Sequence, residues 1–185
     1  MAIFSKRYLL CLLLIVSLGF NAYHFIAVRS DKNNSINMYK YYMEMHAVTF
    51  SNALASTGGQ EIREYINSPD HVSNIIEGIE LAEFQYVVAS KYIPDEERKD
   101  KSISTLQSQS LINGYLSELR TYRAHLYQNN QEPYANINQI YTDIDDLIQI
   151  STWINENTKF SVYTDQDFYR DVYPLLKSDL KKNFF

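Results

Sequence analysis

The architecture of this chain is decided by residues 8–28, which read YLLCLLLIVSLGFNAYHFIAV. The stretch contains no formally charged side chain, and the basic pair Lys6 and Arg7 precedes it. Its length is close to the roughly 20 residues with which a helix crosses about 30 Å of hydrocarbon. More than half of its positions are Leu, Ile, Val or Phe, which together favour membrane insertion by about 4–7 kcal/mol. The sequence therefore predicts a transmembrane anchor near the N-terminus.

The same stretch has an alternative interpretation as a cleaved signal peptide. Its most apolar part, residues 8–20, fits a signal-peptide core of about 7–15 residues. A cleavage site with two small residues should then follow. Phe20-Asn21-Ala22 instead places a bulky aromatic ring at the first small position. We therefore favour a retained anchor, with a secreted protein as the alternative.

The basic residues also predict the orientation of the anchor. Lys6 and Arg7 form the shorter and denser basic flank, which usually stays cytoplasmic. We expect residues 1–28 to be a cytoplasmic stub with a transmembrane anchor, and residues 29–185 to be an extracytoplasmic domain at the cell membrane. Cys11, the only cysteine, lies inside the apolar run, so a disulfide within the domain is excluded.

Charge and motifs exclude several classes of function. All 22 acidic residues lie in the domain, whereas nucleic acid requires a basic surface. The chain has no Gly-rich phosphate loop, no nucleophile elbow, and neither the H-E-x-x-H nor the E-x-x-H pattern of metal-binding helices. We therefore expect no nucleic-acid partner, no cofactor, no metal site and no enzymatic activity.

The hydropathy pattern predicts an all-α domain. Five glycines and four prolines in 185 residues leave few turn formers, which favours long helices. Apolar residues recur every third or fourth position, as on one face of an amphipathic helix. These stripes predict long helices over residues 34–56, 69–93, 95–128 and 133–154, a short helix at 60–66, and a terminal helix from Thr164 that Pro174 kinks or restarts. The predicted fold is an N-terminal transmembrane helix followed by an antiparallel four- to five-helix bundle.

Three tyrosines near the start of the first bundle helix are candidate contact residues. Tyr39, Tyr41 and Tyr42 are too close in sequence for all of them to face one helical core. At least one ring must therefore be exposed or meet a partner, and tyrosine is enriched at binding surfaces. His46 lies on the apolar stripe of the same helix, where we expect a packed, hydrogen-bonded side chain rather than a ligand.

Acidic residues supply a second, weaker candidate surface. Glu77, Glu80 and Glu83 recur every third residue along the second bundle helix. A solvated helix face is the simpler interpretation, and a surface for a cation or a basic partner is the alternative. Asp143, Asp145 and Asp146 lack the pattern of a calcium loop, and we expect them to have helix-start or surface roles.

Together these features favour a single-pass, membrane-anchored protein that acts as an interaction or structural module of the cell envelope. The anchor at residues 8–28 would contact the membrane, and the domain would present a helical surface to an envelope protein. A small-molecule-binding sensor bundle is the alternative, because helical bundles can bind ligands between their helices. The sequence leaves the oligomeric state open, including a homodimer through the first helix.

Overall fold

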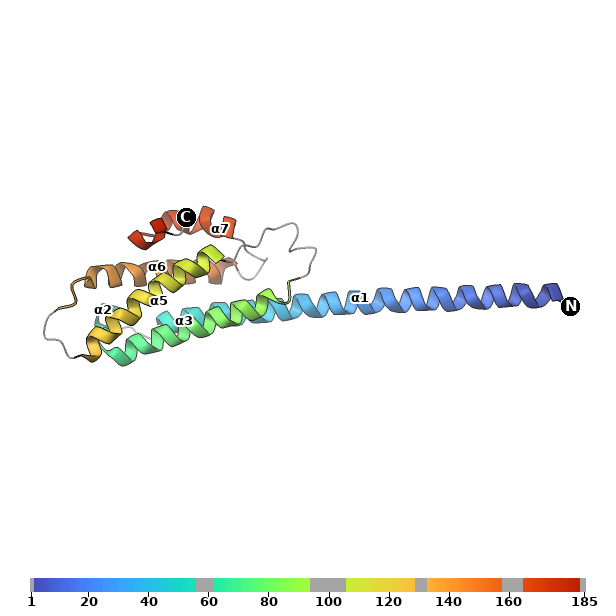
Figure 1. The fold of residues 1–185 in the computed structure, drawn as a ribbon, viewed down its shortest axis with the longest axis horizontal. Coiled ribbons are helices and arrows are strands. Elements are labelled where there is room, and N and C mark those ends of the chain that lie inside the picture. The colour runs from blue at the N-terminus through green and yellow to red at the C-terminus, as the bar shows by residue number, and fades with distance from the viewer. Residues whose placement is uncertain (1, 56–61, 94–105, 129–132, 158–164, 184–185) are drawn as a thin grey trace.

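The computed structural model describes all residues except 1, 56–61, 94–105, 129–132, 158–164 and 184–185 (Figure 1). The regular structure of this described part is helical, without strands. Its elements are α1 (Ala2–Ala55), α2 (Ile62–Tyr65), α3 (Pro69–Ser90), α5 (Leu106–Tyr127), α6 (Ile137–Asn157), α7 (Asp165–Asp171), η1 (Tyr173–Leu175) and η2 (Asp179–Asn183). The predicted all-α fold, a long apolar first helix followed by a helical bundle, is confirmed.

The first helix is longer than the sequence pattern suggested. α1 runs without interruption through the predicted anchor and the predicted helix over 34–56, because no glycine or proline separates Val28 from Asn34. Its 54 residues span about 80 Å. The N-terminal part projects from the bundle as a straight stalk (Figure 1).

Within the described chain, α1 is the one helix long and apolar enough to cross a membrane. The most apolar window of α1 has no buried residue, so it does not resemble the core helix of a soluble protein. Leu14, Phe20 and Phe25 are each more than 60% exposed. Such a stretch stays exposed to water only at a large hydrophobic cost, which membrane insertion removes.

The C-terminal half of α1 packs against α3 along most of its length. The two helices come closest where Gly78 of α3 faces Ala53 of α1. α6 covers another side of α1, and α5 closes the bundle against α3 and α6. The resulting core is built from the predicted stripes; its largest fully buried side chains include Met43, Phe50, Ile75, Ile79, Leu111, Tyr115, Leu119 and Ile140.

Helix boundaries differ from the prediction at one place in particular. We expected α6 to begin at Pro133, but it begins at Ile137. Pro133 and Tyr134 precede a turn, and the Asn136 carbonyl accepts the first helical hydrogen bonds from Gln139 and Ile140, at 2.9 and 3.2 Å. The proline thus leads into the turn before the helix and does not occupy its first turn.

Other predicted boundaries are closer to the structure. Ser68 occupies the N-cap position of α3 with extended backbone, although its side chain makes no capping hydrogen bond. Pro174 lies in η1, so the terminal helix does break and restart around this proline. The expected helix stop at Gly58-Gly59, the helix start at 95–97 and the cap at Thr164 lie outside the described residues.

Candidate functional site

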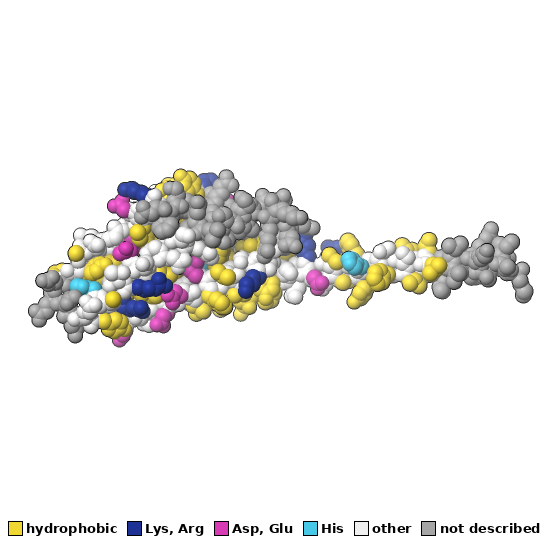
Figure 2. Space-filling model, in the orientation of Figure 1, with side chains coloured by type: hydrophobic (Ala, Val, Ile, Leu, Met, Phe, Trp, Pro, Cys, Tyr) yellow, Lys and Arg dark blue, Asp and Glu magenta, His cyan; other side chains and the backbone are white. Residues whose placement is uncertain are grey.

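Two neighbouring helices present a large group of apolar side chains to solvent. The group, which we call the apolar face, consists of Tyr41, Met45 and Val48 on α1 and Leu81, Phe84 and Val87 on α3. Their exposed fractions lie between 39% and 64%. In Figure 2, hydrophobic side chains gather along the lower edge of the bundle, where α3 lies in Figure 1. Several large apolar side chains exposed on packed neighbouring helices typically mark an interaction site.

The apolar face arises because α1 carries two apolar stripes instead of one. Met43 and Phe50 point into the core, as in any amphipathic helix of a bundle. Tyr41, Met45 and Val48 repeat with the same spacing of three and four on the opposite side of the helix. The bundle uses only the first stripe, so the second has no partner among the described residues.

The three candidate tyrosines are divided between the core and the surface. Tyr39 is buried, while Tyr41 is 54% exposed and belongs to the apolar face. Tyr42 is half-buried and stacks on Tyr92, with ring centroids 5.7 Å apart. The ring of Tyr41 meets Tyr42 edge-on at 5.4 Å. Tyr42 therefore contacts both the exposed ring of Tyr41 and the ring of Tyr92.

The three candidate glutamates do not share one environment. Glu77 is exposed, and Glu80 pairs with Arg120 of α5 at 2.5 Å on the surface. Glu83 is half-buried and lines a small cavity between α3, α5 and α6. Spacing by three residues rotates successive side chains around the helix, which separates the first glutamate from the last.

The cavity beside Glu83 is too small for an organic ligand. Its volume is about 10 Å³, which is room for about one water molecule. Ile112, Ile150 and Phe168 supply apolar walls, and Ser108 and Gln109 are the polar neighbours. Burial in these surroundings raises the pKa of Glu83 to about 7. The carboxyl group of Glu83 therefore gains or loses its proton near neutral pH.

The raised pKa of Glu83 predicts a measurable pH dependence of stability. The folded state keeps this proton up to about pH 7, whereas the unfolded carboxyl loses it near 4.5. The contribution of Glu83 to stability should therefore be complete below pH 4.5 and fall by about 3 kcal/mol as the pH rises to 7. The lowered pKa of His46 acts in the opposite direction over the same range, so the contribution of Glu83 is measured as a difference between variants. Because Glu83→Gln removes this contribution, the stability difference between this variant and the parent in urea unfolding should change by about that amount between pH 4.5 and 7, whereas the exposed control Glu77→Gln should show no such change. An identical slope in the Glu83→Gln variant would contradict the assignment.

His46 joins α1 to α3 inside the core. Its Nδ1 lies 2.8 Å from the carbonyl oxygen of Ala82, while its Nε2 is buried without a hydrogen-bond partner. Burial lowers the pKa of His46 to about 4, against the opposing effect of the hydrogen bond. The ring packs against Phe50 and Tyr86 with centroids 5.9 and 5.3 Å away. His46 is therefore a neutral, packed histidine at ordinary pH.

Two of the three aspartates on α6 are buried, which corrects the expectation of surface roles. Asp143 and Asp146 are fully buried, and only Asp145 is exposed. The expectation was wrong because the acidic residues at 143 and 146 fall on the same helical stripe as Ile140 and Leu147. Burial of carboxylates requires partners, and the C-terminal segment provides them.

The Asp146 carboxylate binds the chain just before η2. It accepts hydrogen bonds from the backbone N–H groups of Lys177 and Ser178, both at 2.8 Å, and from the Tyr115 hydroxyl at 3.0 Å. These contacts fasten the C-terminal segment across α5 and α6. We call this group the C-terminal clasp.

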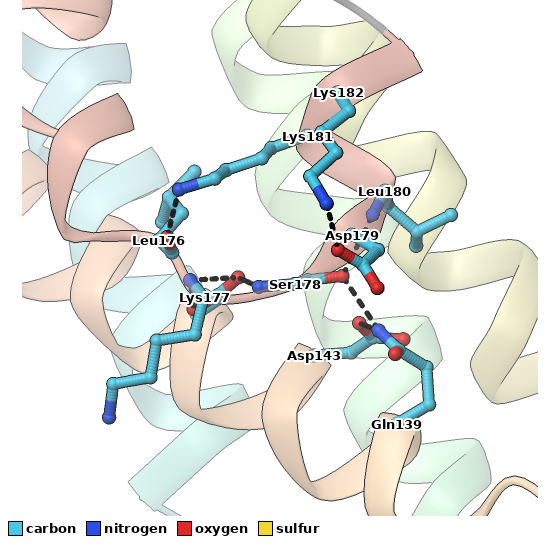
Figure 3. Close-up of polar contacts among 10 residues, drawn as sticks. Gln139, Asp143, Leu176, Lys177, Ser178, Asp179, Leu180, Lys181 and Lys182 are labelled. Carbon is cyan, nitrogen blue, oxygen red and sulfur yellow. Dashed lines mark hydrogen bonds and ion pairs between the residues drawn. The ribbon is translucent and has the colours of Figure 1, made fainter.

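Asp143 is the second carboxylate of the clasp, and only one of its two oxygen atoms accepts a hydrogen bond from a described residue. Gln139 donates to Oδ1 of Asp143 and to the Ser178 hydroxyl, both at 2.7 Å, as Figure 3 shows. Oδ2 of Asp143 is buried without a partner among the described residues. Burial raises the pKa of Asp143 to about 6, and the neighbouring Asp146 adds to the shift. In Figure 3 the Lys177 side chain extends away from Asp143, and the clasp is made by backbone and hydroxyl groups instead.

The described residues contain no group of three or more His, Cys, Asp or Glu side chains that could hold a metal ion. Both oxygen atoms of Asp146 accept hydrogen bonds from groups of the chain itself, which suits a structural role. The most distinctive surface feature is therefore the apolar face. Comparisons with protein-family models, curated proteins and solved structures find no match.

Proposed function

We propose that this chain is a single-pass membrane protein whose extracytoplasmic domain is a protein-interaction module of the cell envelope. The apolar face carries this proposal, because six large apolar side chains stand exposed on two packed helices. Lys6 and Arg7 support a cytoplasmic N-terminus, and the exposed apolar stalk of α1 supports membrane insertion. Confinement by the anchor raises the concentration of the domain near other membrane proteins.

The apolar face is too far from the anchor to be a lipid contact. Tyr41 and Val48 follow Val28 by 13 and 20 residues, which at 1.5 Å per residue places them about 20–30 Å beyond the apolar run. Lipid headgroups extend only about 5–8 Å beyond the hydrocarbon on each side. A protein surface is therefore the expected occupant of the apolar face.

The alternative of a small-molecule sensor receives no support from the cavity beside Glu83. A drug-sized ligand needs a pocket of roughly 300–1,000 Å³, and this cavity holds about one water molecule. The apolar face also lacks the enclosed shape that small ligands need, since its side chains are all well exposed.

Affinity purification of the full-length protein from detergent-solubilised membranes tests the proposal. We expect a stoichiometric protein partner and an N-terminus intact before Ala22. Phe84→Glu places a charge in the apolar face and should reduce recovery of the partner by tenfold or more, a loss of about 1.4 kcal/mol or more. Leu175→Glu changes another exposed apolar residue, in η1, and should leave the recovery unchanged. Equal recovery from both variants, or the absence of any partner, whether another protein or a second copy of this chain, would contradict the proposal.

A further inference from the structure

A stripe of uncharged residues runs along α1 from the anchor to the apolar face. The stripe begins in the anchor and ends in the apolar face. Its members are spaced by three and four residues and are Tyr23, Ala27, Ser30, Asn34, Asn37 and Tyr41. We call this the α1 stripe. Apart from Ala27, which is half-buried, these side chains are exposed. The spacing keeps all of them on one side of the helix, opposite to the core residues Met43 and Phe50.

Charged residues avoid the α1 stripe although the stalk is rich in them. Between Tyr23 and Tyr41 the charged residues are Arg29, Asp31, Lys32 and Lys40, and each falls between stripe positions. Lys32, two residues from both Ser30 and Asn34, projects from the opposite side of the helix. A stalk that meets only water has no reason to segregate its charges in this way. The pattern is that of a helix with a partner on one side.

We infer that the α1 stripe and the apolar face are covered by a second copy of this chain, in a parallel dimer. The inference rests on the proposed function and names the partner of the same surface. The stripe continues into the apolar run, so its occupant must also pass from the envelope into the membrane beside α1. A second copy does so automatically, because its own anchor inserts in the same direction.

The residue types of the stripe fit this parallel arrangement. A twofold axis along the stalk brings each stripe residue opposite its own equivalent, as in any symmetric pair. Ala27 and Ser30 are small, which allows two helix backbones to approach closely where they leave the membrane. Asn34 and Asn37 occupy stripe positions, and asparagine in the seam between two helices favours two-stranded pairing in a fixed register. Above it, the apolar side chains of the face supply the hydrophobic contact.

Disulfide cross-linking of the full chain in native membranes tests the dimer. In a Cys11→Ser background, Ser30→Cys and Asn34→Cys place thiols on the stripe, and Lys32→Cys places a matched thiol on the opposite side. All three positions are exposed on the stalk, so the bundle should fold equally in each variant. Because a disulfide needs Cβ atoms about 3.5–4.5 Å apart, we expect at least about fivefold more dimer from positions 30 and 34 than from position 32.

The outcomes separate this inference from the proposed function. Equal cross-linking at the three positions, or more at position 32, would overturn the dimer. If that result came with a different protein recovered through the apolar face, the interaction module would stand with another partner. If no protein were recovered either, both the dimer and the interaction module would fail. If the dimer persists in the Phe84→Glu variant, the two copies contact each other only along the stalk. The inference that a second copy covers the apolar face would then be wrong.

Discussion

Replacing Asp146 with alanine is expected to destabilise the domain by about 3–5 kcal/mol, the largest effect of any single substitution considered. The substitution removes a carboxylate that accepts from two backbone N–H groups and a tyrosine hydroxyl. Ser178 is buried, so its backbone N–H would lose its partner without gaining water. The C-terminal segment should then detach from α5 and α6 before the rest of the bundle unfolds.

Urea unfolding in detergent, followed by fluorescence of the single tryptophan, measures this effect. Trp153 lies on α6 and packs edge-on against Phe168 at 5.8 Å, so it reports on the same region. Asp145→Ala is the matched control, because this neighbouring carboxylate is exposed, and it should change stability by less than about 0.5 kcal/mol. Similar losses in both variants would show that the clasp does not hold the C-terminal segment.

Gly78→Ala should destabilise the contact between α1 and α3 by about 2 kcal/mol, although alanine is the better helix former. A Cβ atom at position 78 would lie 2.5 Å from the Cβ and 3.2 Å from the Cα of Ala53. Real Cβ atoms do not approach that closely, so the two helices must move apart. Separation would loosen the packing around the buried His46, which joins the same helices.

A second substitution can relieve that clash. In the double variant Ala53→Gly, Gly78→Ala, the methyl group is moved from one helix to the other, and most of the lost stability should return. The coupling free energy from the double-mutant cycle should therefore exceed about 1 kcal/mol. Additive effects would mean that the close approach of the two helices is not what requires glycine at position 78.

The helical architecture was predictable because its signals are local. Stripes with a spacing of three and four residues correspond to the core faces of α1, α3, α5 and α6. The continuity of α1 through residues 29–33 was missed, since polar residues there lack apolar periodicity but are not helix breakers. The start of α6 was placed too early because proline is compatible with both a helical first turn and the turn before it.

The candidate surface was predictable only in part. Close spacing of Tyr39, Tyr41 and Tyr42 indicated that one ring must be exposed, and the structure identifies Tyr41. Leu81 and Phe84 were missed, because their exposure depends on how α3 is rotated against α1. Asp143 and Asp146 fall on the apolar stripe of α6, so their burial could have been predicted from periodicity. Their partners could not, because they come from a segment about 30 residues later in the chain.

Site-specific photo-cross-linking in intact cells measures directly whether the apolar face meets another protein. A photoreactive phenylalanine analogue at position 84 samples the apolar face with little change of shape, and the same analogue at position 175 is the control. We expect a protein adduct of defined mass from position 84, and little or none from position 175. An apolar face that yields no more adduct than the control would contradict the interaction module.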